Sequence, residues 1–305
     1  LMAGGPAKTY KNPVVNYSLP DPTVIKGEDG YFYLYATEDI RNLPIHRSKD
    51  LVNWESVGTA FTPETRPTFE SKGNLWAPDI NKIGHKYVLY YSMSRWGSEW
   101  TCGIGVAASD KPEGPFKDHG MMFRSNEIGV QNSIDPFYIE DGGKKYMFWG
   151  SFRGIWAIEL ADDGLSLKPG AGKRKIAGDQ YEGTYIHKRD GYYYLIVSTG
   201  DFMKDYHVVV GRSRSLMGPY VDRAGRDMLG VHHELVVGNG NGFVAPGHNA
   251  EFITDDKGQD WMLYHTRLEV GGPRYLLLDR IEWNDGWPEV RGHVPARSAE
   301  APVFE

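Results

Sequence analysis

Five polar side chains able to carry acid, base or ligand chemistry recur along the chain in similar short stretches. They are Asp21 in LPDPTVI, Asp79 in WAPDI, Asp135 in IDPFYI, Glu182 in YEGTYI and His248 in GHNAEFI. They stand about 47 to 66 residues apart, close to the repeat length of a β-propeller blade. A single Asp-Pro pair is an ordinary turn former. Five polar residues at matching positions instead predict a wet, functional centre, because an apolar core does not tolerate lone carboxylates.

Three of these residues, Asp21, Asp135 and Glu182, supply the carboxyl groups needed to cleave an acetal. That reaction requires one protonated carboxyl to assist the leaving oxygen and one ionised carboxylate to activate water or attack carbon. Carboxyls that crowd one another have their pKa values pushed apart, and this separation assigns the acid and the base. Glu182 has the longest reach of the three and is the candidate acid.

The elements that would position these residues are short strands that also repeat. A Gly-rich turn leads into an aromatic strand at five places, which read DGYFYLYAT (29–37), GHKYVLYYS (84–92), GGKKYMFWGS (142–151), DGYYYLIVST (190–199) and KGQDWMLYHT (257–266). Runs of this kind between Gly and Asp are typical of strands and hairpins. The sequence therefore predicts an all-β, five-bladed β-propeller over 1–305 as one domain, with blades that begin near the five polar residues.

The composition limits the other classes of function. The 305 residues include 40% hydrophobic and 24% charged residues, with a net charge of −6; an acidic chain is a poor candidate for binding nucleic acid. There is no apolar run of about 18 residues, so we expect no membrane span. The first residues do not read as a signal peptide, and Cys102, the one cysteine, is expected to be a buried apolar residue.

With these motifs in place, the chain resembles glycoside hydrolase family 43, and within it the arabinanase-like branch. The resemblance runs almost from end to end through LPDPTVI (19–25), LWAPDI (75–80), NSIDPF (132–137), FWGSF (148–152), YEGTYI (181–186), GRSRSLMGPY (211–220), GHN (247–249) and WNDGWP (283–288). One departure is STGDFMKDYHVVVGRS, which lacks the cysteine pair often found there in that branch. The resemblance implies a five-bladed propeller that hydrolyses glycosides with inversion of configuration.

The resemblance also implies roles for individual residues. Asp21 would be the general base that activates water, Glu182 the general acid, and Asp135 the group that tunes the acid and orients the substrate. His248 would lie on the propeller axis beside a hydrated ion, usually calcium, although one imidazole nitrogen is an unusual ligand for calcium. Asp79 is expected to be structural.

Four further residues are implied as substrate-binding groups. Trp76 would be a stacking platform for a sugar ring, Asn132 and Ser151 would be polar groups beside the pocket, and Arg274 would lie against the base.

The leading interpretation is an inverting hydrolase of α-L-arabinofuranosyl linkages in plant cell-wall polysaccharide, most of all α-1,5-arabinan. An exo-acting α-L-arabinofuranosidase and a β-D-xylosidase are the nearest alternatives, and a catalytically silent sugar-binding propeller is an alternative of another class. A related retaining family of furanoside propellers would need its carboxyls closer together. The expected partners are arabinan and arabino- or xylo-oligosaccharides. We expect a monomer that is secreted or periplasmic.

Overall fold

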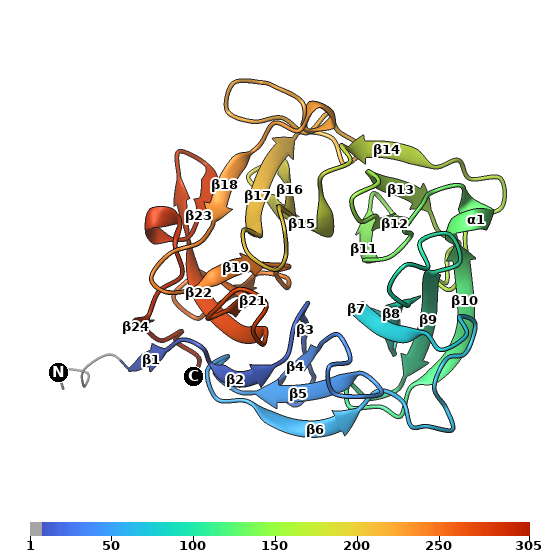
Figure 1. Cartoon of the computed structure of the whole chain (residues 1–305), viewed down its shortest axis with the longest axis horizontal. Helices are drawn as coiled ribbons and strands as arrows, with labels where there is room; N and C mark the ends of the chain where they lie inside the picture. Colours follow the sequence, from blue (N-terminus) through green and yellow to red (C-terminus); the bar gives the residue numbers. More distant parts are fainter. Residues whose placement is uncertain (1–7) are drawn as a thin grey trace.

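The computed structural model describes residues 8–305 and confirms the five-bladed β-propeller (Figure 1). Each blade is an antiparallel sheet that runs outward from the centre. The first blade consists of β3 (Thr23–Lys26), β4 (Phe32–Tyr35), β5 (Pro44–Ser48) and β6 (Glu55–Thr59). The second consists of β7 (Asn74–Ile83), β8 (Lys86–Ser94), β9 (Gly103–Ser109) and β10 (Lys117–Arg124).

The third and fourth blades repeat the same order. The third contains β11 (Phe137–Asp141), β12 (Lys144–Trp149), β13 (Ile155–Glu159) and β14 (Arg174–Ala177). The fourth contains β15 (Glu182–Arg189), β16 (Tyr192–Thr199), β17 (His207–Ser213) and β18 (Glu234–Val237). Only short helices occur in the described residues, namely α1 (Ser125–Ile128), η1 (Met228–Gly230) and η2 (Arg291–His293).

The fifth blade is built from both ends of the chain. Its sheet runs β19 (Val244–Gly247), β21 (Asp260–Arg267), β22 (Tyr275–Asn284) and β2 (Val15–Ser18). The short strands β20 (Ile253–Thr254) and β23 (Trp287–Glu289) add to β21 and β22, and β1 (Thr9–Lys11) pairs with β24 (Ser298–Glu300). The outer strand of the last blade therefore comes from the start of the chain, and this pairing closes the ring.

The hydrophobic core lies between neighbouring blades. The aromatic repeats form the second strand of each blade, and their side chains pack across to the next blade. Tyr90 on β8 stacks on Tyr138 of β11, with 5.7 Å between ring centroids, and Met147 and Trp149 of the third blade belong to the same buried cluster. Because each blade buries its faces against its neighbours, the five depend on one another for stability.

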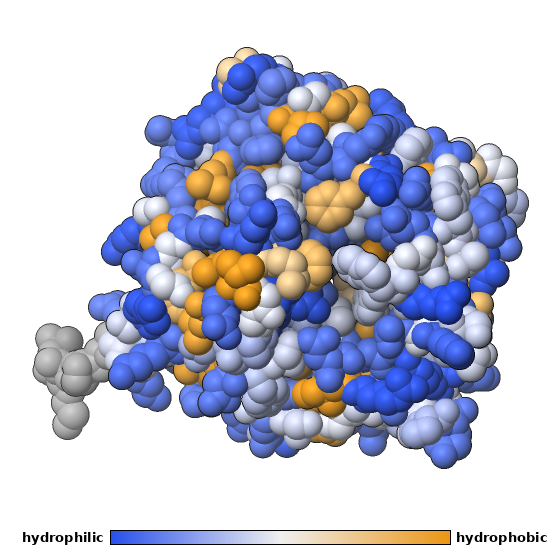
Figure 2. Space-filling model, viewed as in Figure 1, coloured by the Kyte–Doolittle hydropathy of each residue, from blue (hydrophilic) through white to orange (hydrophobic). Residues whose placement is uncertain are grey.

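The surface agrees with the composition. The face in Figure 2 is mostly hydrophilic, with hydrophobic residues in several small groups, one of them close to its centre. Cys102 is a buried free thiol. Across residues 8–305 there is no helix long and apolar enough to cross a membrane.

Candidate active site

A repeated hydrogen bond between neighbouring blades positions the residues at the centre. A polar residue close to the C-terminal end of the aromatic second strand accepts the backbone N–H of the residue at the head of the next blade. These bonds join Ala77 to Thr37 (2.8 Å), Asp135 to Ser92 (2.9 Å), His248 to Ser198 (2.8 Å) and Asp21 to His265 (3.1 Å). At the equivalent place before the fourth blade, the Ser151 hydroxyl donates to Glu182 Oε1 at 2.7 Å. We call these five contacts the latches.

The latches locate the predicted blade heads in space. In the second blade the latched residue is Ala77, and Asp79 lies two residues further along β7. Asp79 is 4% exposed and accepts the backbone N–H of Tyr138 at 2.8 Å, which joins the second blade to the third. Ala77 lines the central cavity, whereas Asp79 is not among the residues that do so.

The latched residues Asp21, Asp135 and His248 share a strained backbone. Their φ angles are 54°, 61° and 48°, in the left-handed region that L-residues with side chains rarely adopt. Strain of this kind persists only where the surroundings hold it, and it is common at functional sites. Here the latch fixes the backbone N–H of each residue at the channel, and all three residues line the cavity.

Asp21 is surrounded by groups that favour its ionised form. The Thr37 hydroxyl donates to Oδ2 at 2.6 Å, the Arg274 guanidinium lies 3.4 Å from the same oxygen, and Nδ1 of His248 lies 3.1 Å from Oδ1. Burial alone would raise the pKa of Asp21. The positive charges of Arg274 and His248 outweigh burial and hold the pKa well below its usual range. Asp21 is therefore a carboxylate at neutral pH, as a general base must be.

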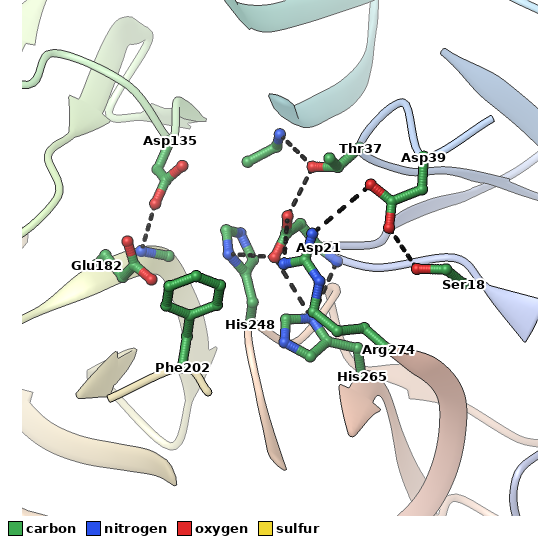
Figure 3. A network of polar contacts seen from close by, with 12 residues as sticks. Ser18, Asp21, Thr37, Asp39, Asp135, Glu182, Phe202, His248, His265 and Arg274 are labelled. Carbon is green, nitrogen blue, oxygen red and sulfur yellow. Dashed lines mark hydrogen bonds and ion pairs between the residues drawn. The ribbon is translucent and has the colours of Figure 1, made fainter. Parts of the chain in front are cut away.

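Glu182 begins β15 and is half-buried across the cavity from Asp21 (Figure 3). Its two oxygens have different partners, since the Ser151 hydroxyl bonds to Oε1 at 2.7 Å and the Tyr206 hydroxyl bonds to Oε2 at 2.5 Å. Two hydroxyls fix the orientation of the carboxyl. They can also rotate to suit either protonation state, because a hydroxyl both donates and accepts.

Asp135 lies beside Glu182, and its surroundings favour the protonated form. Its Oδ2 accepts the backbone N–H of Gly183 at 3.2 Å, and its side chain is almost fully buried. Burial raises the pKa of Asp135 well above the usual range. His248 opposes this shift, and the negative charges of Glu182 and Asp21 add to it. The cavity thus holds Asp21, whose surroundings favour the ionised form, on one side and Asp135, whose surroundings favour the protonated form, beside Glu182 on the other; glycoside hydrolysis needs environments that differ in this way.

His248 lies between the two sides. Burial lowers the pKa of its ring, but the negative charge of Asp21 and the hydrogen bond to it prevail and raise the pKa to about 9. Its ring packs against the backbone of Gly183, where an added Cβ would stand 3.2 Å from the imidazole. Gly183 also has a φ of 67°, so both its conformation and this close approach require glycine.

The calcium ion expected at His248 stays a prediction. Nδ1 faces Asp21, which leaves Nε2 as the nitrogen that an ion could use, and an ion would compete with a proton for this ring. Calcium prefers six to eight oxygen ligands. Within residues 8–305, no group of three or more His, Cys, Asp or Glu side chains is arranged to hold a metal. The side chains therefore fit calcium only through one nitrogen, with water supplying the remaining ligands.

All five blades line the cavity, which has a volume of about 490 Å³. The four predicted substrate-binding residues, Trp76, Asn132, Ser151 and Arg274, are all part of the lining. Sequence reasoning missed other lining residues, namely Thr37, His265, Tyr206, Trp96 and Phe202. Thr37 and His265 lie at the ends of their aromatic repeats, so an alignment of the repeats could have identified them. Tyr206, Trp96 and Phe202 lie outside the repeated strands.

Comparison with known proteins agrees with this geometry. The family model "Glycosyl hydrolases family 43" matches residues 10–288. Arabinan endo-1,5-alpha-L-arabinosidase C of Emericella nidulans is 33% identical over 86% of this chain and 88% of its own length. Extracellular exo-alpha-(1->5)-L-arabinofuranosidase ArbA of Cellvibrio japonicus is 31% identical over 88% of this chain and 85% of its own length.

Two of the solved structures that resemble this chain are also arabinanases. The structure of Cellvibrio cellulosa alpha-L-arabinanase superposes with a TM-score of 0.80 and 31% identity, covering 92% of this chain and 99% of that one. Native Bacillus subtilis arabinanase Arb43A superposes with a TM-score of 0.77 and 29% identity, covering 90% of this chain and 98% of that one. The chain therefore belongs to glycosyl hydrolase family 43, and it is a glycosidase.

Proposed function

We propose that this glycosidase hydrolyses α-L-arabinofuranosyl linkages with inversion, and that α-1,5-arabinan is its main substrate. The observation that carries the mechanism is the contrast within one cavity between Asp21, whose pKa is held low by Arg274 and His248, and Asp135, whose pKa is raised by burial beside Glu182. The substrate class is supported by the relatives, whose names describe endo- and exo-acting enzymes on α-1,5-linked arabinan.

In the proposed reaction Asp21 takes a proton from water while the water oxygen attacks the anomeric carbon. The bond from that carbon to the leaving oxygen breaks, and Glu182 passes a proton to the leaving oxygen. The product sugar carries the new hydroxyl in the inverted configuration, with Asp21 protonated and Glu182 ionised. Solvent then exchanges both protons and resets the pair. Arg274 and Thr37 keep Asp21 oriented, and Asp135 holds a proton beside the acid.

A substrate panel tests the proposal. Linear arabinan, branched arabinan, arabinoxylan and the nitrophenyl arabinofuranoside and xyloside should rank with linear arabinan first, and NMR of the first product should show the inverted anomer. Preference for the xyloside would favour the β-D-xylosidase alternative. Retained configuration would contradict the mechanism. Folded wild-type protein that cleaves none of them would favour a sugar-binding propeller.

Calcium at His248 is tested separately. If bound, the ion would supply positive charge on the axis and order water between the carboxyls. We expect elemental analysis of purified protein to find about one calcium per chain, and His248→Ala to lose it. Protein that contains no calcium when purified in its presence would overturn the prediction.

We further propose that the enzyme acts outside the cytoplasm, as a secreted or periplasmic monomer. Four relatives carry the word extracellular in their names, and the five blades of one chain together line the cavity. Cell fractionation and light scattering after gel filtration test these two statements.

A further inference from the structure

Two aromatic side chains from non-adjacent blades, the second and the fourth, meet at the mouth of the cavity. Trp96 belongs to the loop between β8 and β9, and Phe202 to the loop between β16 and β17. Their ring centroids are 6.2 Å apart at an angle of 43°, within the range of favourable aromatic pairs. Both line the cavity, and Trp96 is 82% exposed, so it lies at the outer surface. We call this pair the aromatic bridge.

The position of the bridge follows from the order of the blades. A line from the second blade to the fourth separates the third blade from the first and fifth. Asp135 belongs to the third blade and Asp21 to the first, so the bridge runs between these two carboxyls, and the exposed Trp96 lies nearer the outer surface than either buried carboxyl. In Figure 3 the Phe202 ring lies between Glu182 and the group formed by His248 and Asp21. Glu182 belongs to the fourth blade, as Phe202 does, so a sugar that reacts between Asp21 and Glu182 lies against the Phe202 end of the bridge.

Both loops are held in place by hydrogen bonds. The carbonyl of Phe202 accepts from Nε of Arg267 at 3.0 Å, and Arg267 is 6% exposed. On the other side, the carbonyl of Glu99 accepts the backbone N–H of Asn132 at 2.7 Å, and Arg153 pairs with the Glu99 carboxylate at 3.1 Å. The bridge therefore joins two anchored loops.

From this geometry we propose that the aromatic bridge roofs the reacting centre, so that arabinan enters by threading a chain end and the enzyme is exo-acting. An internal segment of a polysaccharide can bind directly only in a groove that is open along its length. Where the bridge covers the passage, the same segment can reach the carboxyls only after a chain end has been threaded beneath the bridge. This inference rests on the proposed activity on arabinan and adds its mode of attack.

Linear arabinan and the same polymer after chemical cross-linking separate the two modes. Cross-links block threading but leave internal bonds open to an enzyme with an open groove. Wild-type protein should release sugars of one small size from linear arabinan and act on the cross-linked polymer at least about tenfold more slowly. Trp96→Ala should raise the ratio of the cross-linked rate to the linear rate by about tenfold, on the scale of one lost aromatic contact.

The readout is a ratio because Trp96 faces the cavity, and its loss can weaken sugar binding on both polymers alike. Phe202→Leu opens the bridge from the other side and should change the ratio in the same direction. Trp100→Ala is the matched control, since Trp100 lies in the same loop, is 50% exposed and is absent from the cavity lining; its ratio should equal that of the wild type.

Equal rates on both polymers for the wild type, or an unchanged ratio in both bridge variants, would overturn the inference. A folded wild-type protein that releases nothing from either polymer would instead remove the proposed activity. The two failures are therefore distinguishable.

Discussion

The backbone N–H of Asp21 donates a hydrogen bond to Nδ1 of His265 across the junction between the first and fifth blades. Nδ1 is then an acceptor, so the ring is neutral and carries its proton on Nε2. Burial, followed by the positive charges of Arg274 and His248, keeps the pKa of His265 well below its usual range despite the nearby Asp21. The 3.4 Å contact between Nδ1 and Asp21 Oδ1 is therefore not an ion pair. Of the two histidines beside Asp21, His248 carries the charge.

Two substitutions separate the proposed acid from the proposed base. Glu182→Gln should lower kcat/KM on arabinan by about a hundred- to ten-thousand-fold, yet lose much less on nitrophenyl arabinofuranoside, whose leaving group needs little protonation. Asp21→Asn should lose activity on both substrates, because water still has to be activated. Steady-state kinetics on the two substrates provide the measurement. Equal losses for Glu182→Gln on both would contradict its assignment as the acid.

Gly183 offers a test of packing at the centre. Gly183→Ala places a Cβ 3.2 Å from the His248 ring at a φ of 67°, so the ring must shift away from Asp21 and kcat should fall by tenfold or more. Gly191→Ala is the control, since its φ is 77° and its Cβ would meet only Arg214. Both variants should lose about 1 kcal/mol of unfolding free energy from the left-handed backbone. Equal kcat in the two variants would mean that the position of His248 is unimportant.

The latches should matter for stability as well as for activity. Ser198→Ala leaves the backbone N–H of His248 without its acceptor, and Ser92→Ala does the same for Asp135. An unsatisfied buried donor costs about 1–3 kcal/mol, so each variant should unfold at lower urea concentration, and kcat should fall because the strained residue loses its anchor. Ser213→Ala is a control on β17, since Ser213 lies outside the cavity lining and accepts only from Ser215 in the following turn. A latch variant with wild-type kcat would show that the other contacts suffice.

Asp279 gives the stability a defined dependence on pH. It is 2% exposed in the fifth blade, where Tyr264 and the backbone of Ala296 donate to it. Burial raises its pKa from 3.8 to about 7. Between these values the native state holds a proton that the unfolded chain has released, so this contribution is complete below about pH 4 and is lost as the pH rises through about 7. For a pKa shift of this size, the largest contribution that this proton can make to the free energy of unfolding is about 4 kcal/mol.

Asp279→Asn should therefore flatten the fall in unfolding free energy between about pH 4 and pH 7, as measured by urea denaturation across that range. Asp79, whose pKa burial also raises to about 7, should leave a residual slope. A slope identical to that of the wild type would show that Asp279 is ionised in the native state.

The repeats explain how much of this could be predicted from the sequence. Carboxyl groups recurred with the aromatic strands, so the number of blades and the residues Asp21, Asp135 and Glu182 followed from the pattern. The latch residues stood at the ends of the same strands, but Thr, Ser and His look unrelated until their common hydrogen bond is seen. The contact between Trp96 and Phe202 had no periodic signal, because it depends on the conformations of two loops that no repeat constrains.

The pairing of β2 with β22 has a consequence for partly folded molecules. Val15 on β2 pairs with Leu276, and Asp21 follows the end of that strand by three residues. The strand pairing that closes the ring of blades therefore also brings Asp21, the proposed general base, next to its partners. We therefore expect a molecule whose first strand has detached to be inactive, so that hydrolytic turnover measures the fraction of closed rings during refolding or limited proteolysis.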